Sequence, residues 1–195
     1  MNVFNMKAAR RLFAALALAM ATGMAAAGPL YHVSIDTSAF SGTGWLDLQF
    51  NPGFDGTPAT ATLSNFSGAL AAGMTPEVQG AVGSSLPGPV TFANSTAFNA
   101  LFQAVQLGGI LGFDLEFLGT SSVFSVGLYG GDQVTALGNP DPFTNSLVTF
   151  ELGQGADIHD PALVTVAEVV AVPEPPVCLL MAAALAAIAL IRWRA

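Results

Sequence analysis

The chain has 195 residues, of which 52% are hydrophobic and only 9% are charged, whereas soluble proteins average about 25% charged residues. All thirteen acidic residues except Glu174 lie between Gly28 and Val172, a segment that has no Lys or Arg and therefore a formal charge of −12. This composition excludes intrinsic disorder, which is typical of chains with few hydrophobic residues and many charges. It also excludes binding to nucleic acid, because the segment offers no cationic side chain to neutralise phosphates.

The N-terminus has the pattern of an export signal. Three basic residues come first: Lys7, Arg10 and Arg11. An apolar run follows at residues 12–21, and the small residues Ala25 and Ala27 then occupy the positions that a signal peptidase recognises, which predicts cleavage before Gly28. The alternative, an N-terminal membrane anchor, is disfavoured because the run is too short to span a bilayer as a helix. We therefore expect residues 1–27 to be a signal peptide.

Alternating apolar and polar residues predict a series of β-strands in the exported segment, residues 28–171. The clearest is residues 113–117, where Phe and Leu alternate with Asp114 and Glu116. Gly, Pro, Asn and Ser separate the further candidates, which are residues 31–36, 45–50, 124–128, 148–152 and 164–166 and, less clearly, 59–66, 78–82 and 90–93. About nine short strands are thus predicted from this pattern.

One segment departs from the strand pattern. Four apolar residues follow the i, i+3, i+4, i+7 spacing of an α-helix: Phe98, Leu101, Phe102 and Val105. Ser95 or Thr96 could cap a short helix that ends by Gly108. Because strands and helices do not alternate, a parallel sheet is disfavoured. The sequence therefore predicts an all-β domain, an antiparallel β-sandwich or jelly roll with one short helix.

Two loops of this domain are rich in side-chain oxygens, residues 132–145 and 155–160. Calcium prefers carboxylate, amide and carbonyl oxygens, so the candidate calcium ligands are the four aspartates of these loops: Asp132, Asp141, Asp157 and Asp160. Two of them could instead bind a transition metal together with His159. In the competing interpretation these residues form turns, because Asp and Asn side chains accept hydrogen bonds from nearby backbone.

Sugar binding and catalysis have weaker support in the sequence. Trp45 lies on the predicted outer face of its strand and could stack on a sugar ring, as could Tyr31 and Tyr129, although an outward aromatic residue also commonly packs against a neighbouring strand or under a loop. Only two histidines are present, His32 and His159, and no G-x-S-x-G motif occurs. Paired carboxylates such as those at 114 and 116 are more typical of a solvated sheet face than of a glycosidase. We therefore expect no enzyme activity.

The C-terminus combines three features in a fixed order. A Pro-rich motif comes first, Pro173-Glu174-Pro175, then an apolar run at residues 177–191, then a basic end with Arg192 and Arg194. As a helix the run would be about 22 Å long, which crosses a bilayer only if flanking residues snorkel or the membrane thins. Terminal arginines favour a cytoplasmic C-terminus. Residues 172–195 are thus predicted to be a membrane-anchored sorting segment with a transmembrane helix.

This tail resembles the PEP-CTERM sorting signal of Gram-negative bacteria. The resemblance implies export through the inner membrane, transient anchoring there, and processing near the motif by an exosortase, a membrane-bound cysteine protease. It also implies a host that makes extracellular polysaccharide. The alternative sorting signal, a eukaryotic GPI-anchor signal, would normally lack the terminal arginines.

The exported segment is itself similar to a recurring group of small PEP-CTERM proteins of unknown function. The similarity includes its opening, GPLYHVSIDTSAFSGTGWLDLQFNPG, and the later pieces NSTAF and FDLEF. We expect a non-enzymatic protein of the cell envelope or extracellular matrix, with signal peptidase, an exosortase, the inner membrane and exopolysaccharide as its partners. The alternative is a carbohydrate-binding module or weak glycan-active enzyme with a structural calcium.

Overall fold

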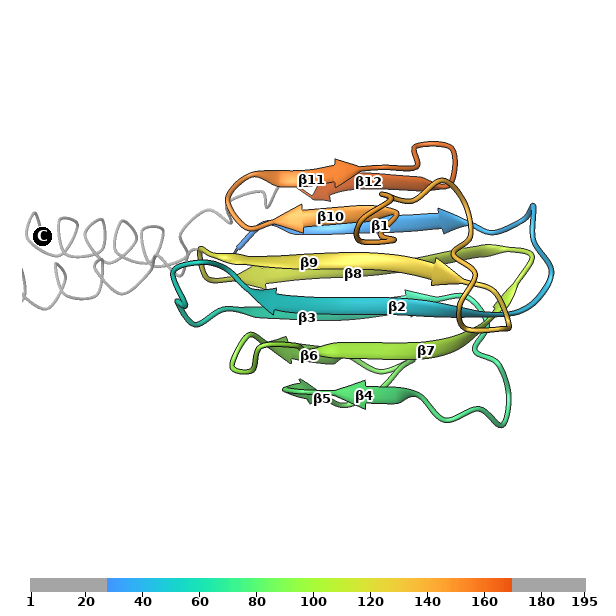
Figure 1. Cartoon of the computed structure of the whole chain (residues 1–195), viewed down its shortest axis with the longest axis horizontal. Coiled ribbons are helices and arrows are strands. Elements are labelled where there is room, and N and C mark those ends of the chain that lie inside the picture. The colour runs from blue at the N-terminus through green and yellow to red at the C-terminus, as the bar shows by residue number, and fades with distance from the viewer. Residues whose placement is uncertain (1–27, 170–195) are drawn as a thin grey trace, which may run out of the picture. The chain divides into compact units, whose positions relative to one another are not determined.

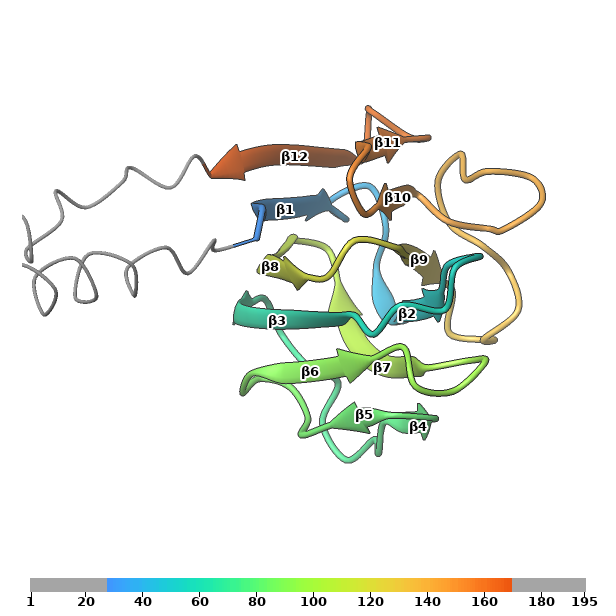
Figure 2. The same cartoon turned by 90° about the vertical axis from the view of Figure 1, so that its left-hand side faces the viewer.

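The structure, a computed structural model, describes residues 28–169, and in this part of the chain the alternating pattern forms two facing antiparallel sheets (Figure 1). Sheet A contains, in spatial order, β12 (Val164–Val169), β1 (Leu30–Asp36), β8 (Ile110–Leu118), β3 (Thr60–Ser67), β6 (Val90–Ala93) and β5 (Val82–Gly83). Sheet B contains β11 (Gly155–Ile158), β10 (Val148–Glu151), β9 (Ser122–Tyr129), β2 (Gly42–Pro52), β7 (Ala100–Leu107) and β4 (Glu77–Gln79). Figure 2 shows the sheets as two layers, so the predicted β-sandwich is confirmed.

Aromatic side chains from both sheets meet in the core between the layers. Phe124 of sheet B contacts Phe92 and Phe117 of sheet A, with ring centroids 5.3 and 6.0 Å apart. Phe150 of sheet B packs on the same Phe117 at 5.8 Å. All four rings are at most 2% exposed. Aromatic pairs at such distances add to the gain from burying their surface, so this cluster joins the two layers.

The predicted helix at residues 98–108 is wrong, because this segment forms strand β7 and no helix occurs within residues 28–169. The apolar residues lie on both faces of the strand. Leu101 and Val105 point into the core, while Phe102 and Ala104 lie on the outer face and pack in a second, smaller cluster. A strand that is buried on both faces does not alternate between apolar and polar residues. In a segment of this length, the spacing of its apolar residues can then match that of a helix.

Two further strands were not predicted. β11 is formed by residues 155–158, for which a loop is predicted, and it pairs with β10 so that Thr149 lies opposite Asp157. The less clearly predicted strand at residues 78–82 corresponds to two short strands, β4 at the edge of sheet B and β5 at the edge of sheet A. Most strongly patterned segments are strands with the predicted inward faces, for example Val33 and Ile35 in β1, which are both fully buried.

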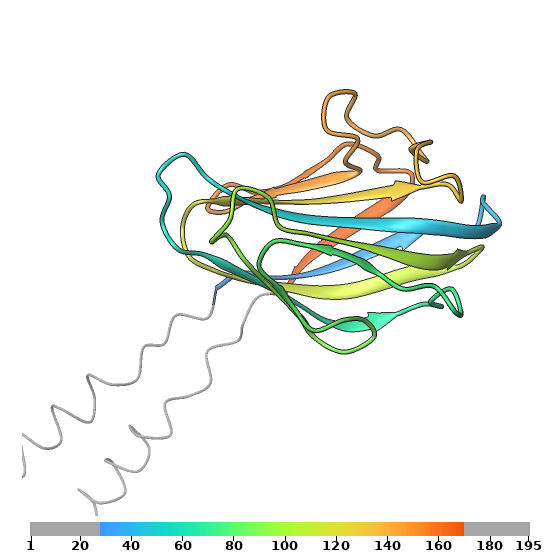
Figure 3. The ribbon, with the colours of Figure 1, turned by 60° about the horizontal axis from the view of Figure 1, so that its bottom comes forward.

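The first and last strands of the sandwich pair with each other, with Leu30 opposite Val169. The described chain therefore begins and ends at one end of the molecule, which we call the terminal end. It also carries the β2–β3 loop at residues 53–59, the β8–β9 turn at 119–121 and the β10–β11 turn at 152–154 (Figure 3). The β7–β8 turn and the loop at residues 130–147 lie at the opposite, far end.

The predicted signal peptide and sorting tail lie outside the described residues, apart from Gly28 at the expected cleavage point. Within residues 28–169, no helix has the length and apolar character needed to cross a membrane.

The buried side chain of Asn99, just before β7, forms hydrogen bonds with three segments of the chain. Its amide nitrogen donates to the carbonyl oxygens of Phe50 and Thr96, both at 2.9 Å, and its oxygen accepts from the backbone of Ala81 at 2.8 Å. Gly80, next to Ala81, has a φ of +70°, and a Cβ there would lie 2.2 Å from the Phe98 carbonyl oxygen. The close approach therefore requires glycine.

We predict that Asn99→Ala lowers the free energy of unfolding by about 3 kcal/mol, because it leaves buried backbone groups without partners. Chemical denaturation monitored by circular dichroism measures this change. Asn139→Ala is the matched control, since Asn139 is exposed, and it should change stability little. Equal stability of the two variants would contradict the structural role of Asn99.

Candidate functional site

Two of the four predicted calcium ligands are engaged by their own turns. Asp132 accepts hydrogen bonds from the backbone nitrogens of Val134 and Thr135 at 3.1 and 3.0 Å, and from the Thr135 hydroxyl at 2.6 Å. Asp141 accepts equivalent bonds from Phe143 and Thr144. These bonds stabilise the charged carboxylates, and the pKa of each is lowered, chiefly by the Thr135 hydroxyl at Asp132 and by the Thr144 N–H at Asp141.

Asp160 is also used internally. It is 5% exposed, and its two oxygens accept from the backbone of Asn139, Ala162 and Leu163 at 2.6 to 3.2 Å. It thereby connects the loop at residues 130–147 to the segment that enters β12. Asp157 is the remaining candidate, and it lies on β11. The structure therefore supports turn formation for three of the four aspartates.

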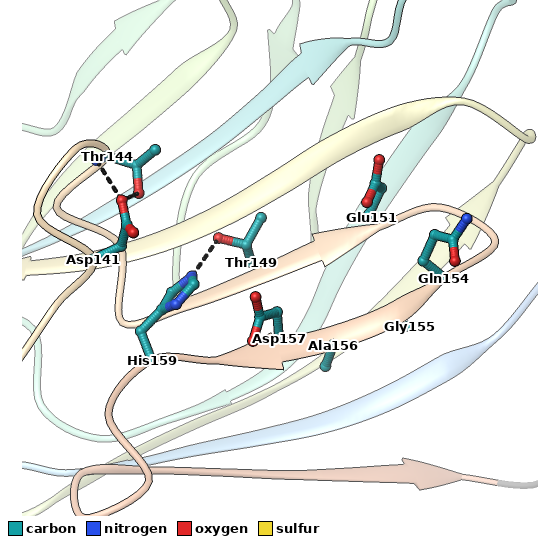
Figure 4. Close-up of a pocket in the computed structure, with 9 residues that line it drawn as sticks. All are labelled: Asp141, Thr144, Thr149, Glu151, Gln154, Gly155, Ala156, Asp157 and His159. Carbon is teal, nitrogen blue, oxygen red and sulfur yellow. Dashed lines mark hydrogen bonds between the residues drawn. The ribbon is translucent and has the colours of Figure 1, made fainter.

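Asp157 lines a polar pocket of about 280 Å³ on the outer surface of the β10–β11 hairpin (Figure 4). Thr149 and Glu151 reach it from β10, and Asp141 and Thr144 reach it from the preceding loop. The remaining lining residues come from the hairpin: Gln154, Gly155, Ala156 and His159. Of the predicted ligands the structure thus brings Asp141 and Asp157 to one pocket, together with His159, but it places Asp132 and Asp160 elsewhere.

A chain of hydroxyl groups crosses one side of this pocket. The Thr144 hydroxyl lies 2.6 Å from that of Ser146, which lies 3.1 Å from Thr149, whose hydroxyl is 3.2 Å from Nε2 of His159. A serine- or threonine-based nucleophile needs a histidine that a carboxylate orients. Within residues 28–169 no carboxylate lies within 4.0 Å of a His159 nitrogen, so the pair lacks the third member of a triad.

Within the described part of the chain, no group of three or more His, Asp or Glu side chains is placed to hold a metal ion. Asp141 accepts three bonds within its own turn, which a cation would have to compete with. The Asp141 carboxylate is thus engaged by its own turn.

We predict that calcium leaves the melting temperature of the β-sandwich unchanged. The test is to treat residues 28–171 with EDTA, add calcium stepwise to millimolar concentration and record thermal melts. A ligand that binds only the folded state raises the melting temperature with its concentration. A saturable rise would therefore contradict this prediction, and magnesium under the same conditions would distinguish specific binding from general screening of the acidic surface.

Trp45 is the predicted sugar-stacking residue, but the structure favours the alternative, in which it packs against a neighbouring strand. Its ring lies on the outer side of sheet B as expected, but it is only 4% exposed. It stacks on Phe102 of the neighbouring strand at 4.9 Å, and Ala71 packs in the same cluster. Tyr31 is 8% exposed and belongs to the main core. These two rings therefore present little surface to a sugar.

Asp47 lies on the same outer face, beside the aromatic cluster that Trp45 forms. It is opposite Gly127 on one side and Phe102 on the other, and Gln49 donates a hydrogen bond of 2.7 Å to its carboxylate. Burial raises the pKa of Asp47, and the bond from Gln49 only partly opposes this. The folded protein therefore holds the Asp47 proton more tightly than the unfolded chain.

Because the pKa of Asp47 is raised in the folded state, its contribution to the free energy of unfolding is greatest at low pH. This contribution falls as the pH rises through the folded pKa. We predict that Asp47→Asn raises the melting temperature at pH 7 by about 2 °C and that the difference shrinks at pH 3. Asp132→Asn should do the opposite, destabilising more at pH 7 than at pH 3, because the pKa of Asp132 is lowered in the folded state. Thermal melts at both pH values measure both effects. A lower melting temperature for Asp47→Asn at pH 7 would contradict the assignment.

The outer face of sheet A carries the other polar cluster. His32 Nδ1 lies 2.7 Å from one Asp114 oxygen, and the Asn65 amide donates to the other oxygen at 2.7 Å. The bonds from Asn65 and then His32 lower the pKa of Asp114. Glu116 lies further along the same strand and is exposed. The predicted solvated face for the two carboxylates is thus confirmed.

A comparison with protein-family models, curated proteins and solved structures finds no match to this chain. The sequence does not predict the pocket beside β11, because the pocket depends on the β10–β11 hairpin and residues 155–160 have the composition of a loop. The available signal was the Leu152-Gly153-Gln154-Gly155 turn between two short segments, since glycines in such a link are typical of hairpins.

Proposed function

We propose that this chain is an exported, non-enzymatic protein of the bacterial cell envelope or extracellular matrix. The observation that carries the proposal is the distribution of charge. Every Lys and Arg lies in the two terminal segments, and the segment between them is purely acidic. Basic residues beside apolar runs direct chains into membranes, and an acidic domain without cations remains soluble outside the membrane.

The proposed route begins with signal peptidase and ends with an exosortase-type protease. The folded strand β12 ends at Val169, and the sorting motif begins four residues later at Pro173. Pro173 and Pro175 favour an extended backbone, which suits access by a protease. The resemblance of the tail to PEP-CTERM signals supports an association with exopolysaccharide. After processing, the domain would be retained in the envelope or released.

We infer that the sandwich is wound as a jelly roll, the second form that the sequence allowed. Sheet A contains the order β1-β8-β3-β6 and sheet B contains the order β2-β7-β4, and β8, β3 and β6 face β9, β2 and β7 (Figure 2). Strands β1 to β4 alternate between the layers, as do strands β6 to β9, which supports this winding. β9, β10 and β11 then extend sheet B beyond β2, and β12 extends sheet A beyond β1.

The route is tested by mass spectrometry of the native protein from cells and from medium. We predict that the mature chain begins at Gly28 and lacks the basic end. Replacing Pro173, Glu174 and Pro175 together by Ala should leave the complete tail in the membrane fraction. Gln133→Ala, in an exposed loop, is the control and should be processed normally. Recovery of the intact chain from the cytosol would contradict the proposal.

A further inference from the structure

The terminal end of the sandwich carries exposed apolar side chains. Phe54, in the β2–β3 loop, is fully exposed, and Leu118, the last residue of β8, is 64% exposed. The two lie at the same end because Pro52 pairs with Ser122 and Thr60 pairs with Leu118. The entering and leaving strands β1 and β12 reach this end as well, with Leu30 opposite Val169.

The length of chain beyond Val169 limits how far this end can be from a membrane. Seven residues, 170–176, separate Val169 from the apolar run that begins at Val177. A fully extended chain covers at most about 3.5 Å per residue, so the spacer reaches about 25 Å. The eleven residues of β2 span about 36 Å at 3.3 Å per residue. The spacer is thus shorter than the sandwich, and the terminal end must remain close to the bilayer.

We propose that, while the tail is anchored, the terminal end rests on the lipid surface with Phe54 and Leu118 in the interface. This inference rests on the proposed membrane anchoring of residues 177–191. Aromatic and aliphatic side chains gain free energy in the interfacial region of a bilayer. Two such residues bind weakly when free, but the tether holds them at a high effective concentration beside the membrane.

Because the apolar contact is weak without the tether, it is reversible. Asp55 follows Phe54 directly, and Glu116 lies on the same strand as Leu118, so the contact brings carboxylates towards the headgroups. Removal of the tail removes the tether, and the remaining apolar contact is too small to retain an acidic domain. Cleavage therefore frees the domain from the lipid surface without any change in its fold.

The far end provides a matched control. Phe143, in the loop at residues 130–147, is 92% exposed, but this loop joins β9 to β10 at the end of the strands opposite Leu30 and Val169. If exposure alone determined lipid contact, Phe54 and Phe143 would behave alike. If the tether determines it, only Phe54 reaches the bilayer.

The experiment uses the full chain reconstituted in phosphatidylcholine vesicles, with Trp193→Phe as the parent. Phe54→Trp and Phe143→Trp are compared with this parent, in which Trp45 remains as a shared buried background. We expect brominated lipids to quench the tryptophan at position 54 about threefold more strongly than that at position 143. Leu118→Trp serves as a second probe of the terminal end, and thermal melts show that each variant is folded.

Flotation of the vesicles after alkaline washing establishes anchoring independently. Equal quenching at positions 54 and 143 in chains that float would overturn the lipid contact and leave the proposed anchoring intact. Chains that fail to float would overturn both. Stronger quenching at 54 and 118 that disappears when residues 172–195 are deleted would establish the contact and its dependence on the tether.

Discussion

Contact between the aromatic side chains of the two sheets is the interaction on which this domain depends. The segment between Gly28 and Val172 has no Lys, Arg or Cys, so it can form neither a disulfide nor an ion pair with Lys or Arg. Within residues 28–169, only His32 has a side-chain nitrogen within 4.0 Å of a carboxylate, that of Asp114. Twelve acidic side chains repel one another. Burial must outweigh this repulsion, and Phe117 and Phe124 lie at the centre of that burial, each in contact with rings from both layers.

Whether the sequence predicts the correct secondary structure for a segment depends on how many faces of the strand are buried by other parts of the domain. Residues 113–117 were predicted correctly because one face of β8 is buried and the other carries Asp114 and Glu116. The sequence predicts a helix for β7 because its outer-face residues Phe102 and Ala104 pack with Trp45, Tyr129 and Ala71, and both faces of the strand are therefore apolar. Trp45 is hidden by the same contact. Period-two patterns show where one face meets solvent, but they cannot show which distant loop covers the other.

The acidic loops illustrate a second limit. Oxygen-rich segments that bind calcium and those that form turns have the same composition, because both use carboxylate oxygens as acceptors. What separates them is whether backbone N–H groups two or three residues ahead point back at the carboxylate, as they do at Asp132 and Asp141. That geometry depends on φ and ψ angles within the loop. Sequence could therefore identify the candidate residues but could not choose between their roles.

The pairing of β1 with β12 links the fold to the proposed export route. Sheet A gains its outermost strand only when residues 164–169 reach β1, and these are the last residues before the spacer. A chain that crosses the membrane from its N-terminus presents them at the end of translocation. On this route, a spacer of seven residues would allow β12 to pair while the following apolar run remains in the bilayer, and a much shorter one would hold this strand at the membrane. On the proposed route, the proline-rich spacer would thus let the domain complete its fold before the tail is removed, and cleavage would act on a domain that is already stable.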